Sequence, residues 1–123
     1  MNNSIIKFSF GTLKVEKDIA IGVINEGVTL DLEKFKQISS TLTAHFKNKP
    51  YGYISHRVNS YAIDPTVYMY VASKDILRAI AIVTEVKIMK TNAIIEKQFV
   101  AQPLEVFHSI SDAKKWIKKH ILL

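Results

Sequence analysis

Strand-like and helix-like segments alternate along most of the sequence, and this alternation restricts the fold more than any other feature. Short apolar runs rich in Ile and Val are separated by stretches whose apolar residues recur every three or four positions. The order reads as an opening pair of strands, then helix and strand in turn, ending on a helix. It predicts an α/β (α+β) fold with a mixed, mainly parallel sheet of four to five strands and about four helices.

The first strands are expected as a hairpin between residues 5 and 24. Leu13 and Val15 alternate with polar neighbours, as in a half-buried strand, and Lys17-Asp18 forms the turn. The run IAIGVI that follows is apolar on both faces, as in an interior strand. The later strands are predicted as YGYISHRV, LRAIAIV and LEVFHSI.

Two of the helices have clear start signals. Asp31 is a good N-cap for a helix whose apolar stripe is Phe35, Ile38, Leu42 and Phe46. Asp64-Pro65 is typical of an N-cap followed by the first helical residue, so VYMYVAS is expected to be a short helix.

The other two helices are predicted from periodicity. A helix from 84 to about 100 is expected to bury one line of residues: Ile88, Asn92, Ile95 and Phe99. In the last helix, Ser111 is the expected cap, with the lysines facing water and an inward face of Ala113, Trp116, Ile117 and either His120 or Ile121.

Length and composition narrow the class of protein. The 123 residues fit a single domain, 1–123. The absence of cysteine excludes disulfides, thiol catalysis and Cys-ligated metals. The N-terminal segment lacks the features of a signal peptide, and no apolar stretch is long enough to span a membrane, so a cytoplasmic location is expected. The net charge of +6 is divided evenly between the two halves, without the clustering that is typical of nucleic-acid binding.

Known catalytic and cofactor-binding motifs are missing from the sequence. The four histidines are isolated, and the four glycines do not form a phosphate-binding loop, so neither a metal nor a cofactor is expected. Two weaker possibilities for chemistry stay open. Glu26 and Asp64 could converge as a carboxylate pair, and His56 could act as a general base beside Ser55 or Ser60.

The segment SHRVNSYAIDPTVYMY, at residues 55–70, is the strongest candidate for a functional surface. It joins a strand to a helix and combines tyrosines, which suit binding surfaces, with charged and amide side chains. The expected interaction surface consists of Arg57, Asn59, Tyr61, Asp64 and Tyr68. Alternatively, the tyrosines pack in the core, and Arg57 forms a structural ion pair with Asp64.

The element order, together with the patterns FGTLKVEKDIAIGVINEGVTLD, RVNSYAIDP and LEVFHSISDAKKWI, resembles the STAS domain. The chain is most similar to the SpoIIAA-like branch of small bacterial proteins, and the resemblance covers nearly the whole chain. STAS antagonists bind partner proteins and carry a phosphorylatable Ser or Thr at the start of a helix. The resemblance implies Thr66 at that position, with Ser60 upstream, although Pro65 separates Thr66 from Asp64 and no Gly follows.

These observations favour a non-enzymatic, STAS-like protein-interaction or regulatory module, acting as a monomer or homodimer. The alternative is a protein that binds a small or lipidic ligand in a cleft beneath the helices. A small hydrolase that uses Asp64, Glu26 or His56 is a third hypothesis.

Overall fold

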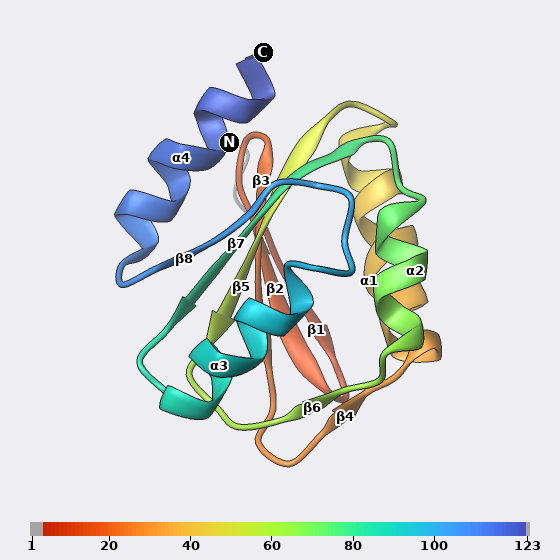
Figure 1. Ribbon diagram of the computed structural model, residues 1–123. Helices are drawn as coiled ribbons and strands as arrows, with labels where there is room; N and C mark the ends of the chain where they lie inside the picture. Colours follow the sequence, from red (N-terminus) through yellow and green to blue (C-terminus); the bar gives the residue numbers. More distant parts are fainter. Residues whose placement is uncertain (1–3, 123) are drawn as a thin grey trace.

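The centre of the structure is a six-stranded mixed sheet in the order β1-β2-β3-β5-β7-β8 (Figure 1). This computed structural model describes residues 4–122, apart from the side chains of Ile88 and Leu122. The strands are β1 (Ser4–Phe8), β2 (Gly11–Val15), β3 (Ile19–Ile24), β5 (Tyr51–Arg57), β7 (Leu77–Thr84) and β8 (Leu104–Phe107). Pairing is antiparallel from β1 to β3 and parallel from β3 to β8. The mixed, mainly parallel sheet is confirmed, with β1 adding one strand to the expected number.

A second, two-stranded sheet lies beyond the carboxyl ends of β3 and β5. It pairs β4 (Thr29–Leu30) with β6 (Ala62–Ile63) in parallel. The backbone N–H of Gly27 donates to the carbonyl of Ser60 at 2.9 Å, which extends this pairing toward the main sheet. Gly27 adopts a φ of 76°, a left-handed conformation that glycine reaches without steric cost. The small sheet therefore holds the two loops of the strand-to-helix junction together.

Four helices complete the fold: α1 (Leu32–Phe46), α2 (Thr66–Ala72), α3 (Lys87–Glu96) and α4 (Ile110–Leu122). The start of α1 is as predicted, because the Asp31 carboxylate accepts a hydrogen bond from the backbone N–H of Lys34 at 2.9 Å. The predicted stripe is also confirmed, since Ile38, Leu42 and Phe46 are buried and Phe35 is partly buried against the same core.

The helices are divided unequally between the two faces of the sheet. Side chains from α1, α2 and α3, including Leu42, Val71 and Met89, share one apolar core with Leu13 of the sheet. A smaller core on the other face contains Ile54 of β5 and Ile117 of α4. Figure 1 shows α4 on the opposite side of the sheet from α1 and α2. Within residues 4–122, one face is thus covered by three helices and the other by α4 alone.

The third helix is shorter than predicted, and a different side of it is buried. It begins at Lys87, because β7 continues to Thr84 and the backbone is still extended at Val86. The residues that face the core are Met89, Ala93 and Glu96. The predicted line of Ile95 and Phe99 is wrong: these side chains are 52% and 57% exposed.

Asn92 and Ile88, the other two residues predicted to be buried along this helix, do not support the prediction. Asn92 lies on the rim of a surface groove rather than in the core, and Ile88 falls outside the described side chains. Glu96 occupies the inward side of this segment, and for this reason Ile95 and Phe99 lie on the outward side.

The last helix also starts earlier than predicted. The hydroxyl of Ser109, not of Ser111, accepts a hydrogen bond from the backbone N–H of Asp112 at 3.1 Å. Ala113 and Ile117 are fully buried against the sheet, as expected. Trp116, His120 and Ile121 are half-buried at the flanks of this contact.

Gly52 allows α4 to approach β5 closely. A Cβ atom at this position would overlap Cγ2 of Ile117, so the substitution Gly52→Ala forces the helix away from the sheet. We expect Gly52→Ala to lower the free energy of unfolding by about 1–3 kcal/mol, as overpacking of a core does. Chemical denaturation measures this change.

The matched control for this prediction is the same substitution in an Ile117→Ala background, which removes the overlapping atoms. There, Gly52→Ala is expected to cost less than about half as much. An equal cost in both backgrounds would show that the packing of Ile117 on Gly52 does not limit the approach of α4.

Candidate functional site

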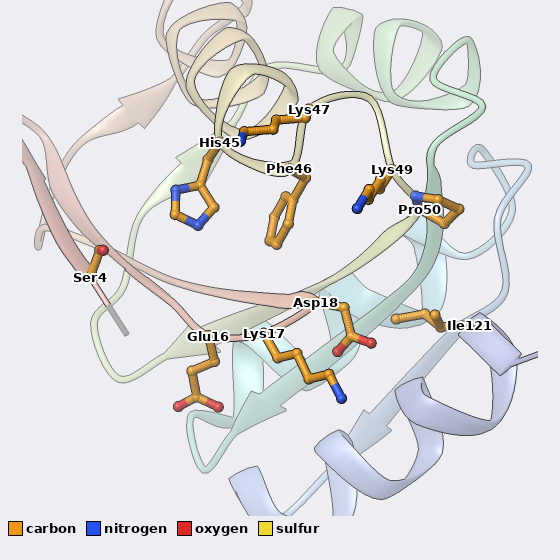
Figure 2. Close-up of a pocket in the computed structure, with 10 residues that line it drawn as sticks. All are labelled: Ser4, Glu16, Lys17, Asp18, His45, Phe46, Lys47, Lys49, Pro50 and Ile121. Atoms are coloured by element: carbon orange, nitrogen blue, oxygen red, sulfur yellow. The ribbon is translucent and has the colours of Figure 1, made fainter. Parts of the chain in front are cut away.

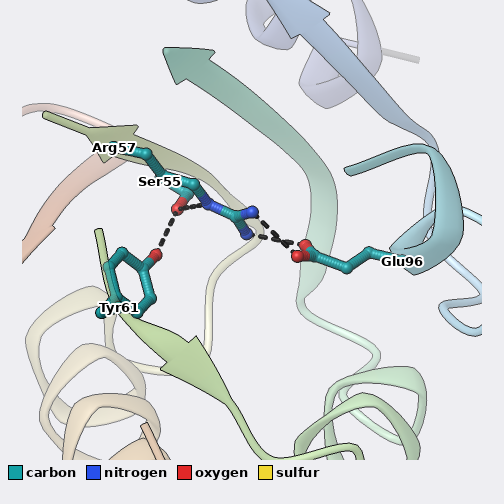
Figure 3. Close-up of polar contacts among 4 residues, drawn as sticks. All are labelled: Ser55, Arg57, Tyr61 and Glu96. Carbon is teal, nitrogen blue, oxygen red and sulfur yellow. Dashed lines mark hydrogen bonds and ion pairs between the residues drawn. The ribbon is translucent and has the colours of Figure 1, made fainter. Parts of the chain in front are cut away.

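Arg57, the last residue of β5, forms a buried ion pair with Glu96, the last residue of α3. The side chain of Arg57 lies on the sheet face that α2 and α3 cover, and the residue is only 4% exposed. Its Nη1 donates to Glu96 Oε2 at 2.8 Å, and its Nη2 donates to Oε1 at 2.6 Å (Figure 3). Two parallel charge-assisted bonds fix the relative orientation of both groups. The pair therefore ties the end of α3 to the centre of the sheet.

The Nε atom of Arg57, which does not contact Glu96, is also hydrogen-bonded. Its Nε donates to Ser55 Oγ at 2.9 Å, and Ser55 Oγ lies 3.2 Å from Tyr61 Oη (Figure 3). The guanidinium carbon is 5.8 Å from the centre of the Tyr61 ring, within the range of a cation–π contact. Arg57 thus connects β5, the segment before β6 and α3.

The surroundings keep this arginine charged. Burial by itself lowers the pKa of Arg57, but the hydrogen bonds and negative charge of Glu96 outweigh burial and raise that pKa above its usual value. Burial and the nearby Glu96 carboxylate also raise the pKa of Tyr68, so its phenol stays neutral near pH 7. The cluster of Arg57, Glu96, Ser55 and Tyr61, here called the Arg57 cluster, is therefore an ionic connection inside the fold.

The structure places the expected interaction surface only partly at the surface. Arg57 and Tyr61 are buried, and the partner of Arg57 is Glu96 rather than Asp64. The side-chain amide of Asn59 donates to the carbonyl of Ile24 at 2.9 Å. Tyr68 is half-buried at the start of α2. These side chains mainly hold the junction together.

The two candidate carboxylates have separate structural roles. Glu26 Oε1 accepts a hydrogen bond from the backbone N–H of Ser60 at 2.9 Å. Asp64 Oδ1 accepts from the backbone N–H of Thr66 at 3.0 Å and from its hydroxyl at 2.9 Å. Asp64 therefore caps the start of α2, as predicted, and each carboxylate stabilises a loop rather than facing the other.

The remaining candidates differ in accessibility. Thr66 and Ser60 are exposed, and whether Thr66 is phosphorylated stays a prediction. His56 lies on the α4 face of the sheet, because successive strand residues point to opposite faces and both Ser55 and Arg57 lie on the other face. The pairing of His56 with Ser55 is therefore wrong.

An apolar surface groove lies between the start of α2 and the outer side of α3. The groove is open to solvent and has a volume of about 470 Å³. Tyr68 and Phe99 stack across it with ring centres 5.8 Å apart. Its lining residues are Tyr61, Ala62, Ile63, Pro65, Tyr68, Met89, Asn92, Ile95, Glu96 and Phe99.

The expected interaction surface includes Tyr61 and Tyr68 of this groove, but none of the lining residues that come from α3 and the turn after it. Glu96 was not considered, although it lies on the same helical stripe as Met89 and Ala93. A carboxylate on an apolar stripe is the signal that could have indicated a buried partner for Arg57.

Two other spaces differ from the groove. A space of about 60 Å³ beneath the helices is lined by Tyr53, Arg57 and Glu96, among others, and is well below the usual size of a ligand site. A wider, open hollow of about 650 Å³ lies where α1 ends and β5 begins, at the other end of β5 from Arg57 (Figure 2). Lysines and carboxylates are mixed in its lining, which includes Lys17, Lys49 and Asp18.

Within 4–122, no three His, Asp or Glu side chains converge in a way that could hold a metal ion. No helix in this part of the chain combines the length and apolar character needed to cross a membrane.

Removing one partner of the Arg57 cluster leaves a buried, unpaired charge. We expect Arg57→Ala to lower the free energy of unfolding by about 3–5 kcal/mol, as measured by denaturant titration. The matched control is Lys97→Ala, which breaks an exposed ion pair with Glu105 at 2.8 Å and should cost less than about 1 kcal/mol. Similar costs for the two variants would contradict a structural role for the buried pair.

Comparison with known proteins identifies the fold and the family. A search of curated proteins found no similar sequence. A solved structure of an uncharacterised protein of the DUF3478 family with a SpoIIAA-like fold, from Shewanella loihica PV-4, superposes with a TM-score of 0.58 at 10% identity. The similarity covers 94% of this chain and 91% of that one, which confirms the expected SpoIIAA-like, STAS-like fold. Residues 13–121 match the profile of a domain of unknown function, DUF7793, and the chain belongs to this family.

Proposed function

We propose that this protein is a non-enzymatic regulatory module of the bacterial cytoplasm, and that the groove between α2 and α3 binds an apolar segment of a protein partner. The observation that carries the proposal is the exposure of Ile95 and Phe99 beside a groove of about 470 Å³. Large apolar side chains that gather at a surface groove are typical of protein-interaction sites.

The Arg57 cluster supports this function by shaping the groove before a partner binds. Because Glu96 is held inward by Arg57, α3 turns Ile95 outward and leaves Phe99 stacked on Tyr68. A groove that is already formed avoids the cost of ordering side chains on binding. On α3, the buried Glu96 thus has a structural role, and the exposed Ile95 has the proposed binding role.

The polar residues of the junction favour binding over catalysis. Arg57, Glu26, Asp64 and Asn59 are engaged by other groups of the fold, as their hydrogen bonds show. The STAS-like fold adds support, because the resemblance implies binding to proteins. Thr66 follows the groove residue Pro65, so a phosphate on its hydroxyl would add negative charge beside Asp64 and the groove.

A comparison of two adjacent isoleucines tests the proposal. Ile95 lines the groove, whereas Ile94 is 66% exposed and lies outside its lining. In an affinity pulldown from nuclease-treated bacterial lysate, Ile95→Asp is expected to reduce recovery of the partner at least about tenfold, because a carboxylate is costly to desolvate in an apolar contact. Ile94→Asp, with the same change of charge, is expected to retain the partner.

Two results would contradict the proposal. One is equal recovery of the partner with Ile95→Asp and Ile94→Asp, which would place the contact elsewhere. The other is the absence of any protein retained by the folded wild type under these conditions.

A further inference from the structure

The outer face of β1, of β2 and of the end of β3 is not covered by a helix in the described part of the chain. Along β2, Leu13 and Val15 point into the main core and are buried, whereas Lys14, between them, is exposed on the other face. That other face is the one on which α4 packs, but α4 lies over β5, β7 and β8. The outer faces of β1 and β2 are therefore open, and that of β3 is covered only at its start.

Exposure increases with distance from α4. Ile19 and Ile21 of β3 are buried at the edge of the α4 core, and Val23 of the same strand is half-buried. Ile5 on the edge strand β1, which is paired with Lys14, is 66% exposed. β1–β3 pair in antiparallel, and antiparallel strands often leave one face open to water, so the side chains of this face are accessible to a partner.

The open face is basic as well as apolar. Lys7 and Lys14 project from β1 and β2 on this side, next to Ile5 and Val23 in the strand register. The prediction that all lysines of the last helix face water is wrong for Lys114, whose ammonium binds Glu16 at 2.8 Å and is half-buried. Lys118, one turn further along α4, lies on the same flank.

The acidic residue at this surface is already neutralised. Glu16 is bound by Lys114 at 2.8 Å and lies 3.7 Å from Lys14. The hydrogen bond from Lys114 holds the pKa of Glu16 below its usual value despite partial burial. The open face therefore presents a net positive charge to any molecule that approaches it.

We infer that the outer face of β1–β3, bordered by α4, binds an acidic amphipathic helix of a partner protein. Strands of five residues span about 17 Å and three neighbouring strands span about 10–14 Å, which matches three turns of one helix about 10 Å in diameter. Apolar side chains of that helix would cover Ile5 and Val23, and its carboxylates would pair with Lys7, Lys14 and Lys118.

Charge and side-chain type disfavour two other occupants. A second copy of the chain on this face would bring the lysines of both copies together, with the nearby Glu16 already paired. Single-stranded nucleic acid is usually bound by aromatic side chains that stack on bases, whereas Ile5, Lys7, Thr12, Lys14 and Val23 form this face.

The inference concerns a second binding surface and does not depend on the groove between α2 and α3. The two surfaces lie on opposite faces of the sheet. Substitutions at Lys7 and Lys14 do not touch the groove lining, and Ile95→Asp does not touch the open face. Either proposal can fail while the other holds.

The test uses a synthetic helix-forming peptide of about 18 residues, with Leu along one stripe and Glu on the other side. Peptide is titrated into the isotope-labelled protein at moderate salt, and amide chemical shifts report the contact. We expect shifts in β1–β3 and a Kd that rises at least about tenfold in Lys7→Glu/Lys14→Glu, because attraction becomes repulsion.

The matched control is Lys115→Glu/Lys119→Glu, which makes the same change of net charge on the exposed side of α4. Its Kd is expected to change less than about twofold at moderate salt, because charges beyond the Debye length are screened. If the charge-reversed protein does not fold, Lys7→Gln/Lys14→Gln replaces it, with an expected weakening of about threefold.

Several results would overturn the inference. They are the absence of shifts in β1–β3, equal weakening in the control, and equal binding of a peptide with the same composition in scrambled order. Tighter binding of a DNA oligonucleotide to the same amides would also overturn it, in favour of a nucleic-acid partner.

Discussion

The buried ion pair between Arg57 and Glu96 is the interaction on which the arrangement of this fold depends. It joins the ends of β5 and α3 across 39 residues of sequence, with hydrogen bonds of 2.8 and 2.6 Å. Removing two charges from water is costly, and the cost is offset only when the geometry is good and the other polar atoms are satisfied. Ser55 and Tyr61 meet that requirement here. The direction in which α3 faces follows from this pair.

The position of α3 links structure to the proposed function. With Glu96 held inward, the same helix exposes Ile94 and Ile95, and the segment after it stacks Phe99 on Tyr68. An apolar surface that would ordinarily be buried is thereby kept at the rim of a groove. On the opposite face, a single helix covers part of the sheet and leaves a basic, apolar area beside it. The protein thus presents two surfaces of different chemistry.

Features set by neighbouring residues could be predicted from the sequence, whereas features set by distant partners could not. Asp31 caps α1 and Asp64 caps α2 because each carboxylate bonds a backbone group within three residues. The predicted position of the strand-to-helix junction is correct, but the alternative partner predicted for Arg57 is Asp64, close in sequence, whereas in the structure the partner is Glu96. The segment 87–99 has apolar residues on several sides, so periodicity alone could not decide which side is buried.

Hydrogen–deuterium exchange of α3 tests most directly whether the Arg57–Glu96 pair holds this helix on the sheet. Wild type and Glu96→Ala would be compared under native conditions, with the amides of α1 as an internal reference. If the pair holds α3, the amides of 89–97 exchange much faster in Glu96→Ala, while those of α1 lose only the protection that reflects global stability. Unchanged protection of α3 relative to α1 would show that other contacts position the helix, and that the groove does not depend on the buried charges.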